Sequence, residues 1–97
     1  MEIKEAQEII KYVYFHKDSM RGLEKTFIWF IEEVGELANA IKKGSKKDIE
    51  REISDVFAWL LSLANLLDIS VEIAFISKYD KCCPSCKQAP CKCLTIN

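Results

Sequence analysis

Apolar residues recur every three or four positions along most of the chain, which is the spacing that places them on one face of an α-helix. This periodicity predicts four helices, over residues 2–17, 26–43, 46–67 and 71–79. No stretch alternates apolar and polar residues as a half-buried strand does, and no segment repeats another. The pattern therefore predicts an all-α domain.

The two central helices are predicted to form an antiparallel hairpin around which the domain is built. Gly44 can end the first helix because glycine tolerates the left-handed backbone of a C-cap, and Ser45 can cap the second. The polar residues 18–22 predict a loop that leads into the hairpin. In this loop Asp18 and Arg21 are expected to cap helix ends or to face solvent.

Each helix of the hairpin carries two carboxylates three residues apart: Glu33 and Glu36 on the first, Glu52 and Asp55 on the second. Because a helix advances about 100° per residue, both pairs lie about 100° and 160° from the centre of their apolar stripe. With a turn at Gly44, residues whose numbers sum to about 88 lie level across the hairpin. Glu36 is then level with Glu52, and Glu33 with Asp55, so the four carboxylates are predicted to converge.

Converging carboxylates repel one another and raise their own pKa values unless a cation lies between them. Mg²⁺ and Mn²⁺ prefer oxygen ligands, so one or two such ions are the expected occupants of this cluster. By the same register Trp29 and Trp59 lie level with each other beside it. The alternative is that the acids are solvated side chains of an exposed helix face, as most helical glutamates are.

Length and charge narrow the possible partners. A single domain of 97 residues buries only a modest core, so a homodimer or homotetramer is expected. A formal net charge of −1 gives no reason to expect a nucleic acid or a membrane as partner. The sequence has no signal-peptide pattern and no run of about 20 apolar residues. We therefore expect a cytoplasmic protein.

All five cysteines fall between residues 82 and 93, in a segment that also holds two prolines. Cys83 and Cys86 have the separation of a zinc knuckle, and Cys91 and Cys93 could complete an all-thiolate Zn²⁺ site. Such a closed site would be structural rather than catalytic. Three alternatives stay open: Cys82 in place of Cys83, redox-active or unpaired thiols, and a tail without structure.

The acidic motifs carry a resemblance to a known family. The segment IEEVGEL, residues 31–37, followed by EISDV, residues 52–56, resembles the signature EExxE…ExxD of the MazG-like nucleotide pyrophosphohydrolases, which are all-α proteins. The flanking Trp29 and Trp59 are also similar to the compact members of this family. The resemblance covers residues 3–79, which gives a MazG-like domain at 1–79 and a Cys-rich tail at 80–97.

This resemblance implies an activity and roles for the acidic residues. MazG-like enzymes hydrolyse (deoxy)nucleoside triphosphates, including noncanonical nucleotides, to a monophosphate and pyrophosphate, and they assemble as dimers or tetramers. Carried over to this chain, Glu33, Glu36, Glu52 and Asp55 would bind Mg²⁺, and Glu32 would hold or activate water. Metal ions suit this reaction because they activate water and neutralise charge that develops on phosphoryl oxygens.

The reaction also needs groups that bind the substrate. The expected set contains basic residues for the phosphates and indoles that could stack on a base: Arg21, Lys25, Lys46, Lys47, Lys78, Trp29 and Trp59. The indoles could instead only pack against the core. Two rival functions also remain, a non-catalytic module that binds a nucleotide or metal, and an interaction protein that recruits its partner through a zinc tail.

Overall fold

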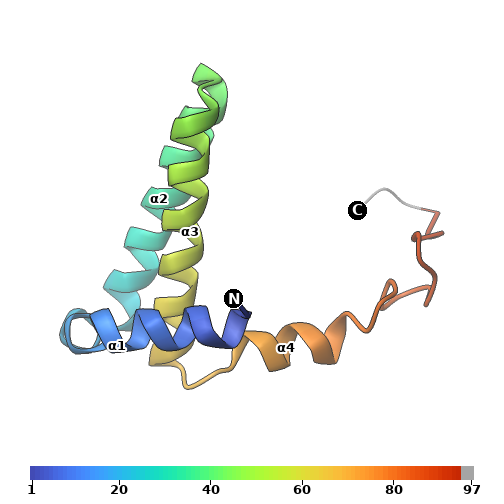
Figure 1. Ribbon diagram of the computed structural model, residues 1–97, viewed down its shortest axis with the longest axis horizontal. Helices are drawn as coiled ribbons and strands as arrows, with labels where there is room; N and C mark the ends of the chain where they lie inside the picture. Colours follow the sequence, from blue (N-terminus) through green and yellow to red (C-terminus); the bar gives the residue numbers. More distant parts are fainter. Residues whose placement is uncertain (95–97) are drawn as a thin grey trace.

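The computed structural model describes residues 1–94, which form four α-helices and no strand, as the sequence predicts. In chain order these are α1 (Ile3–Arg21), α2 (Leu23–Lys43), α3 (Lys46–Leu66) and α4 (Val71–Lys78). Figure 1 shows α2 and α3 side by side as a tall hairpin, with α1 lying across its base. Helix α4 and the segment that follows extend away from this base, so the chain has the shape of an L (Figure 1).

The hairpin turn has the chemistry that its sequence predicts. Gly44 adopts the left-handed conformation, with a φ of 81°, and its backbone N–H donates to the carbonyl of Ala40. The Ser45 hydroxyl accepts a hydrogen bond from the backbone N–H of Asp48 at 3.4 Å. These two caps end α2 and start α3 within two residues. The antiparallel register of the hairpin is therefore fixed at its tip.

The predicted loop at residues 18–22 is wrong. Helix α1 continues to Arg21 and α2 starts at Leu23, so only Gly22 lies between them, with a φ of 88° that favours glycine. Asp18, expected at a surface, is 2% exposed, and Thr26 is completely buried. The helix persists because Asp18 gains an ion pair with Arg21, at 2.8 Å, once both lie on the same turn.

Gln7 fixes the sharp corner between α3 and α4, whose axes differ by 98°. Its amide nitrogen donates to Asn65 Oδ1 at 3.0 Å and to the carbonyl of Ile69 at 2.7 Å. Its amide oxygen accepts from the backbone N–H of Val71, the first residue of α4, at 3.0 Å. One side chain of α1 therefore satisfies polar groups on both sides of the corner.

The buried core of the single chain is small; most of it lies near the base of the hairpin, where α1 crosses, and Ala40 lies near the tip. Its apolar members are Ala40, Leu61, Leu63 and Ala64. The apolar stripes predicted as core are only partly covered: Val34, the centre of one, is 40% exposed, and Ile53, the centre of the other, 53%. A two-helix hairpin offers each stripe only one neighbour, so the remaining width stays open.

Helix α4 shows the same lack of cover. The apolar periodicity of residues 71–79 predicts that Val71, Ala74 and Phe75 point inward, but no residue of α4 is buried. The Cα radius of gyration of 15.8 Å exceeds the roughly 13 Å of a compact domain of this length. Within the described residues, no single helix is long and apolar enough to cross a membrane, and α3 and α4 pass that test only together, as a pair bent by 98°.

Candidate functional site

Three carboxylates meet on the α2–α3 hairpin. Glu33 comes from α2, and Glu52 and Asp55 come from α3. One carboxylate oxygen of each lies within 4.8 Å of the others, so the three could hold a single metal ion. The indoles of Trp29 and Trp59 stack beside them, with ring centroids 6.0 Å apart, as their level positions predict. The register derived from the turn therefore places the acids and the indoles together.

The fourth predicted ligand, Glu36, does not belong to this close group. Its charge nevertheless acts on the group, because it contributes to the raised pKa of Glu33. Glu32, the expected water-activating residue, is exposed on the neighbouring face of α2 and is also outside the group. Geometry thus separates a tight triad from two glutamates at its edge.

The surroundings of Glu33 disfavour the ionised form of its carboxylate. Burial raises the pKa of Glu33 above its ordinary value, and repulsion by Asp55, Glu52 and Glu36 raises it further. A cation placed among these groups would remove both the repulsion and the cost of burying charge. The cluster therefore has the donor chemistry and the electrostatic need for a metal ion.

A cavity of about 300 Å³ adjoins the triad through Asp55. Its wall is polar, charged and aromatic, and it is formed by Tyr14, Lys17, Asp18, Arg21, Asp55, Ala58, Trp59 and Ser62. The Arg21 guanidinium lies 4.9 Å from the centroid of the Trp59 ring, within cation–π distance. Helix α1 thus brings two cations to the acidic cluster on the hairpin.

Asp18 lies in this wall, although its place in the sequence predicts a cap or a solvated loop residue. Asp18 Oδ1 accepts a hydrogen bond from Arg21 at 2.8 Å, and Arg21 also donates to the hydroxyl of Thr26 at 3.3 Å. The other oxygen, Oδ2, is buried and has no hydrogen-bond partner among the described residues. The i, i+3 spacing of Asp18 and Arg21 was the available signal, since it continues the periodicity of the first helix.

Of the predicted substrate-binding residues, the structure brings Arg21 and Trp59 into the cavity wall and stacks Trp29 on Trp59. Lys25, Lys46 and Lys78 do not line this cavity. Lys78 lies on α4, with its ammonium 5.5 Å from the Tyr79 ring, away from the hairpin. Lys17, which was not predicted, takes their place in the wall.

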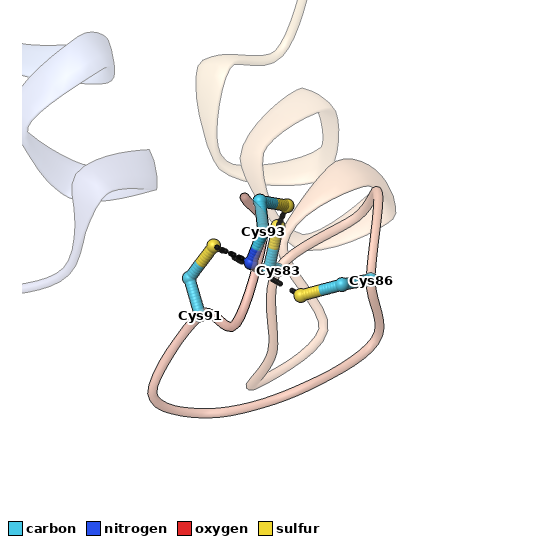
Figure 2. A group of neighbouring side chains, drawn as sticks. All are labelled: Cys83, Cys86, Cys91 and Cys93. Atoms are coloured by element: carbon cyan, nitrogen blue, oxygen red, sulfur yellow. Dashed lines mark hydrogen bonds between the residues drawn. The ribbon is translucent and has the colours of Figure 1, made fainter. Parts of the chain in front are cut away.

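A second cluster of possible ligands lies beyond α4. The sulfur atoms of Cys83, Cys86, Cys91 and Cys93 lie within 4.8 Å of one another, and Figure 2 shows the four side chains turned toward one another. Backbone N–H groups of Cys86 and Ser85 lower the pKa of Cys83 to about 6.

Hydrogen bonds among the sulfurs act in the opposite direction at Cys93. Interactions with Cys91, Cys86 and Cys83 raise the pKa of Cys93 to about 12. The four sulfurs form one close group. This group could hold a metal ion, separately from the acidic triad.

Comparison with known proteins agrees with the hairpin geometry. The family model described as the MazG nucleotide pyrophosphohydrolase domain matches residues 21–87, more than half of the chain. The match starts at the end of α1, contains the whole acidic cluster, and extends into the Cys-rich segment as far as Lys87. No curated protein matches the chain significantly.

Proposed function

Because the chain belongs to the MazG nucleotide pyrophosphohydrolase domain family, we propose that it hydrolyses (deoxy)nucleoside triphosphates to a monophosphate and pyrophosphate in a Mg²⁺- or Mn²⁺-dependent reaction. One observation carries this proposal: the carboxylates of Glu33, Glu52 and Asp55 adjoin a cavity that also holds Arg21 and Trp59. A single site thus offers ligands for a divalent cation, a charge for a phosphate and an aromatic face.

The three carboxylates fit a hard divalent cation. Oxygen ligands around one Mg²⁺ lie about 3 to 4 Å apart, and the oxygens of the triad are within 4.8 Å before any adjustment. We assign Glu33, Glu52 and Asp55 as the first ligands and Glu36 as a further one, because its charge already acts on Glu33. A bound cation of this kind neutralises the triphosphate and activates water for attack.

The remaining roles belong to side chains around the triad. Glu32 directly precedes Glu33 and lies exposed on the neighbouring face of α2, and we propose that it holds the attacking water and takes its proton. Arg21 and Lys17 line the cavity, where they would compensate phosphate charge. The cavity of about 300 Å³ is at the lower end of the range for small-molecule sites, so it would take only part of the nucleotide, with the phosphates between its two cations and the carboxylates.

The exposed apolar surface supports a homodimer or homotetramer. A purely apolar groove between α2, α3 and α4 is lined by residues that include Phe27, Ile28, Leu60 and Leu67. Surface of this kind is costly in water and is normally covered by another subunit. We propose a cytoplasmic enzyme whose partners are its own copies and a nucleotide, without nucleic acid or membrane.

The test is a product assay on the purified full chain. Standard and modified ribo- and deoxynucleoside triphosphates are incubated with Mg²⁺ or with EDTA, and the products are separated as monophosphate plus pyrophosphate or diphosphate plus phosphate. We expect Mg²⁺-dependent pyrophosphate release that is lost in Glu52→Gln. The matched control is Glu50→Gln, which changes an exposed glutamate on the same helix outside the triad and should keep full activity.

Two outcomes would contradict the enzymatic proposal. Release of phosphate instead of pyrophosphate would place the cleavage at a different bond. Absence of all turnover by a folded protein that still binds Mg²⁺ and nucleotide would show a non-catalytic binding module. Light scattering after size-exclusion chromatography gives the oligomeric state, and a monomer would refute the proposed assembly.

A further inference from the structure

The segment after α4 is ordered around its cysteines and has no apolar core of its own. Among the described residues it makes two hydrogen bonds between backbone groups, from Cys83 N–H to the carbonyl of Gln88 at 2.9 Å and from Lys87 N–H to the carbonyl of Cys83 at 2.8 Å. None of the described residues from 80 to 94 is buried. Such a segment cannot offset the entropy of ordering its backbone by apolar burial. Something else must hold this loop closed.

The separations of the sulfur atoms indicate what closes it. Cys83 Sγ lies 3.8 Å from Cys93 Sγ, and Cys86 Sγ lies 3.9 Å from Cys91 Sγ. A disulfide needs about 2.05 Å, so neither pair is bonded. Four sulfurs at about 2.3 Å from the centre of a tetrahedron are about 3.8 Å apart, the edge that a Zn²⁺ tetrathiolate requires. The two measured separations match this edge.

We propose that Cys83, Cys86, Cys91 and Cys93 bind one structural Zn²⁺ ion. Each thiol gives its proton to solvent as its sulfur coordinates, so binding releases protons and leaves a complex with two negative charges. All four positions of the tetrahedron are taken by protein, so the ion has no open position for substrate or water. The site would therefore hold the loop from Cys83 to Cys93 closed, and it is distinct from the acidic cluster on the hairpin.

Backbone groups around the sulfurs support a bound ion. The N–H of Lys92 donates to Cys86 Sγ at 3.3 Å, and the N–H of Cys93 donates to Cys91 Sγ at 3.4 Å. Hydrogen bonds of this kind orient metal-bound thiolates and lower their negative charge. Lys87 adopts a left-handed conformation, with a φ of 61°, directly after Cys86. This reversal turns the chain back toward Cys91 and Cys93 (Figure 2).

Charge and the softness of the sulfur ligands favour Zn²⁺ at the cysteines over Mg²⁺, the ion proposed for the acidic triad of the hairpin. Thiolates are soft ligands, which Mg²⁺ does not accept, and a tetrahedral set of four sulfurs selects zinc or iron. Lys81, Lys87 and Lys92 are interleaved with the cysteines and offset the negative charge of the complex. The closeness of all four sulfurs suits one ion, since an iron–sulfur cluster spreads its thiolates over several irons.

The experiment measures metal on the full chain and does not depend on enzymatic activity. Elemental analysis of the purified protein should give one Zn per chain. After chelation, Co²⁺ serves as the probe, and its titration should saturate at one ion per chain with sulfur-to-cobalt charge-transfer bands and the visible bands of tetrahedral Co²⁺. Added Zn²⁺ should remove these bands. The reaction itself is not monitored, so failure of the proposed hydrolase leaves this result unchanged.

Matched variants assign the ligands. Cys83→Ser and Cys91→Ser should each lose the bound Zn and the cobalt bands, whereas Cys82→Ser, which changes the adjacent thiol outside the cluster, should keep both. Circular dichroism should show unchanged helix content, since residues 80–94 contribute no helix. Iron in place of zinc, no bound metal, or equal loss in Cys82→Ser would overturn the proposal. Zn lost in Glu33→Gln would also overturn it, because the ion would then lie on the hairpin.

Discussion

The ion pair between Asp18 and Arg21 gives the sharpest prediction from the structure. The Asp18 side chain is 3% exposed and the Arg21 side chain 22%, and their 2.8 Å contact lies within α1, in the wall of the proposed nucleotide cavity. The substitution Arg21→Ala leaves the buried carboxylate without its cation. Breaking a buried ion pair from one side costs about 3–5 kcal/mol.

Partial exposure of the guanidinium reduces this expected loss, so we expect about 3 kcal/mol for Arg21→Ala, the lower end of that range. In a domain of this size, that corresponds to a melting temperature lower by about 12–24 °C. The decisive comparison adds Asp18→Asn. Alone, Asp18→Asn should destabilise the protein, because it weakens the interaction with Arg21. In the Arg21→Ala background it should stabilise the protein, because it removes the uncompensated charge.

The wild type, the two single variants and the double variant form a double-mutant cycle. Their free energies of unfolding are measured by urea denaturation followed by circular dichroism, at one protein concentration, since association would otherwise change the apparent stability. The sign of the second substitution is the readout. If Asp18→Asn lowers the stability of Arg21→Ala further, the carboxylate is not a buried charge that needs Arg21. A loss below about 1 kcal/mol for Arg21→Ala would refute the reasoning in the same way, because it is the value of an exposed pair.

Three further predictions concern the cluster and the α3–α4 corner. Without metal, the raised pKa of Glu33 contributes stability that is fully present below the ordinary value of 4.5 and is lost as pH rises through the raised pKa. Urea unfolding of the wild type across this range should show this contribution, and the wild type should differ from Glu33→Gln by its loss. Mg²⁺ should raise the melting temperature of the wild type at neutral pH and have little effect on Asp55→Asn, whereas an equal shift in both would contradict binding at the triad. Gln7→Leu should lower the free energy of unfolding by about 2–3 kcal/mol, because Oδ1 of buried Asn65, the carbonyl of Ile69 and the N–H of Val71 all lose their hydrogen-bond partner. The substitution of the neighbouring exposed residue, Glu8→Ala, should change it little.

Local chemistry in the sequence determined the hairpin and the register of its acids. Gly44 and Ser45 specify the turn, and once the turn is placed the rise and angle of the helix fix which residues are level. The meeting of Glu33 with Asp55 and the stacking of Trp29 on Trp59 follow from this arithmetic. The cysteine spacing likewise predicted the four sulfurs that converge. The family resemblance read from the acidic motifs is confirmed by the family match.

Tertiary structure decided the features that depend on contacts between distant segments. Gln7 became the support of a corner more than 55 residues away, because the crossing of α1 over the hairpin brings these groups together. The same crossing buries Asp18, whose partner Arg21 lies on its own helix. Local propensity cannot reveal such a crossing, since the residues involved look like ordinary polar positions on a helix.

Tertiary structure also decided how much of each apolar stripe is buried. Periodicity predicted apolar stripes as the core, but one chain covers only part of them, as the exposure of Val34 and Ile53 demonstrates. An apolar stripe is more stable when it is buried, but its sequence does not specify which helix or subunit covers it. The sequence therefore determined the helices and the chemistry they carry, and the packing of helices against one another decided which of those side chains share a site.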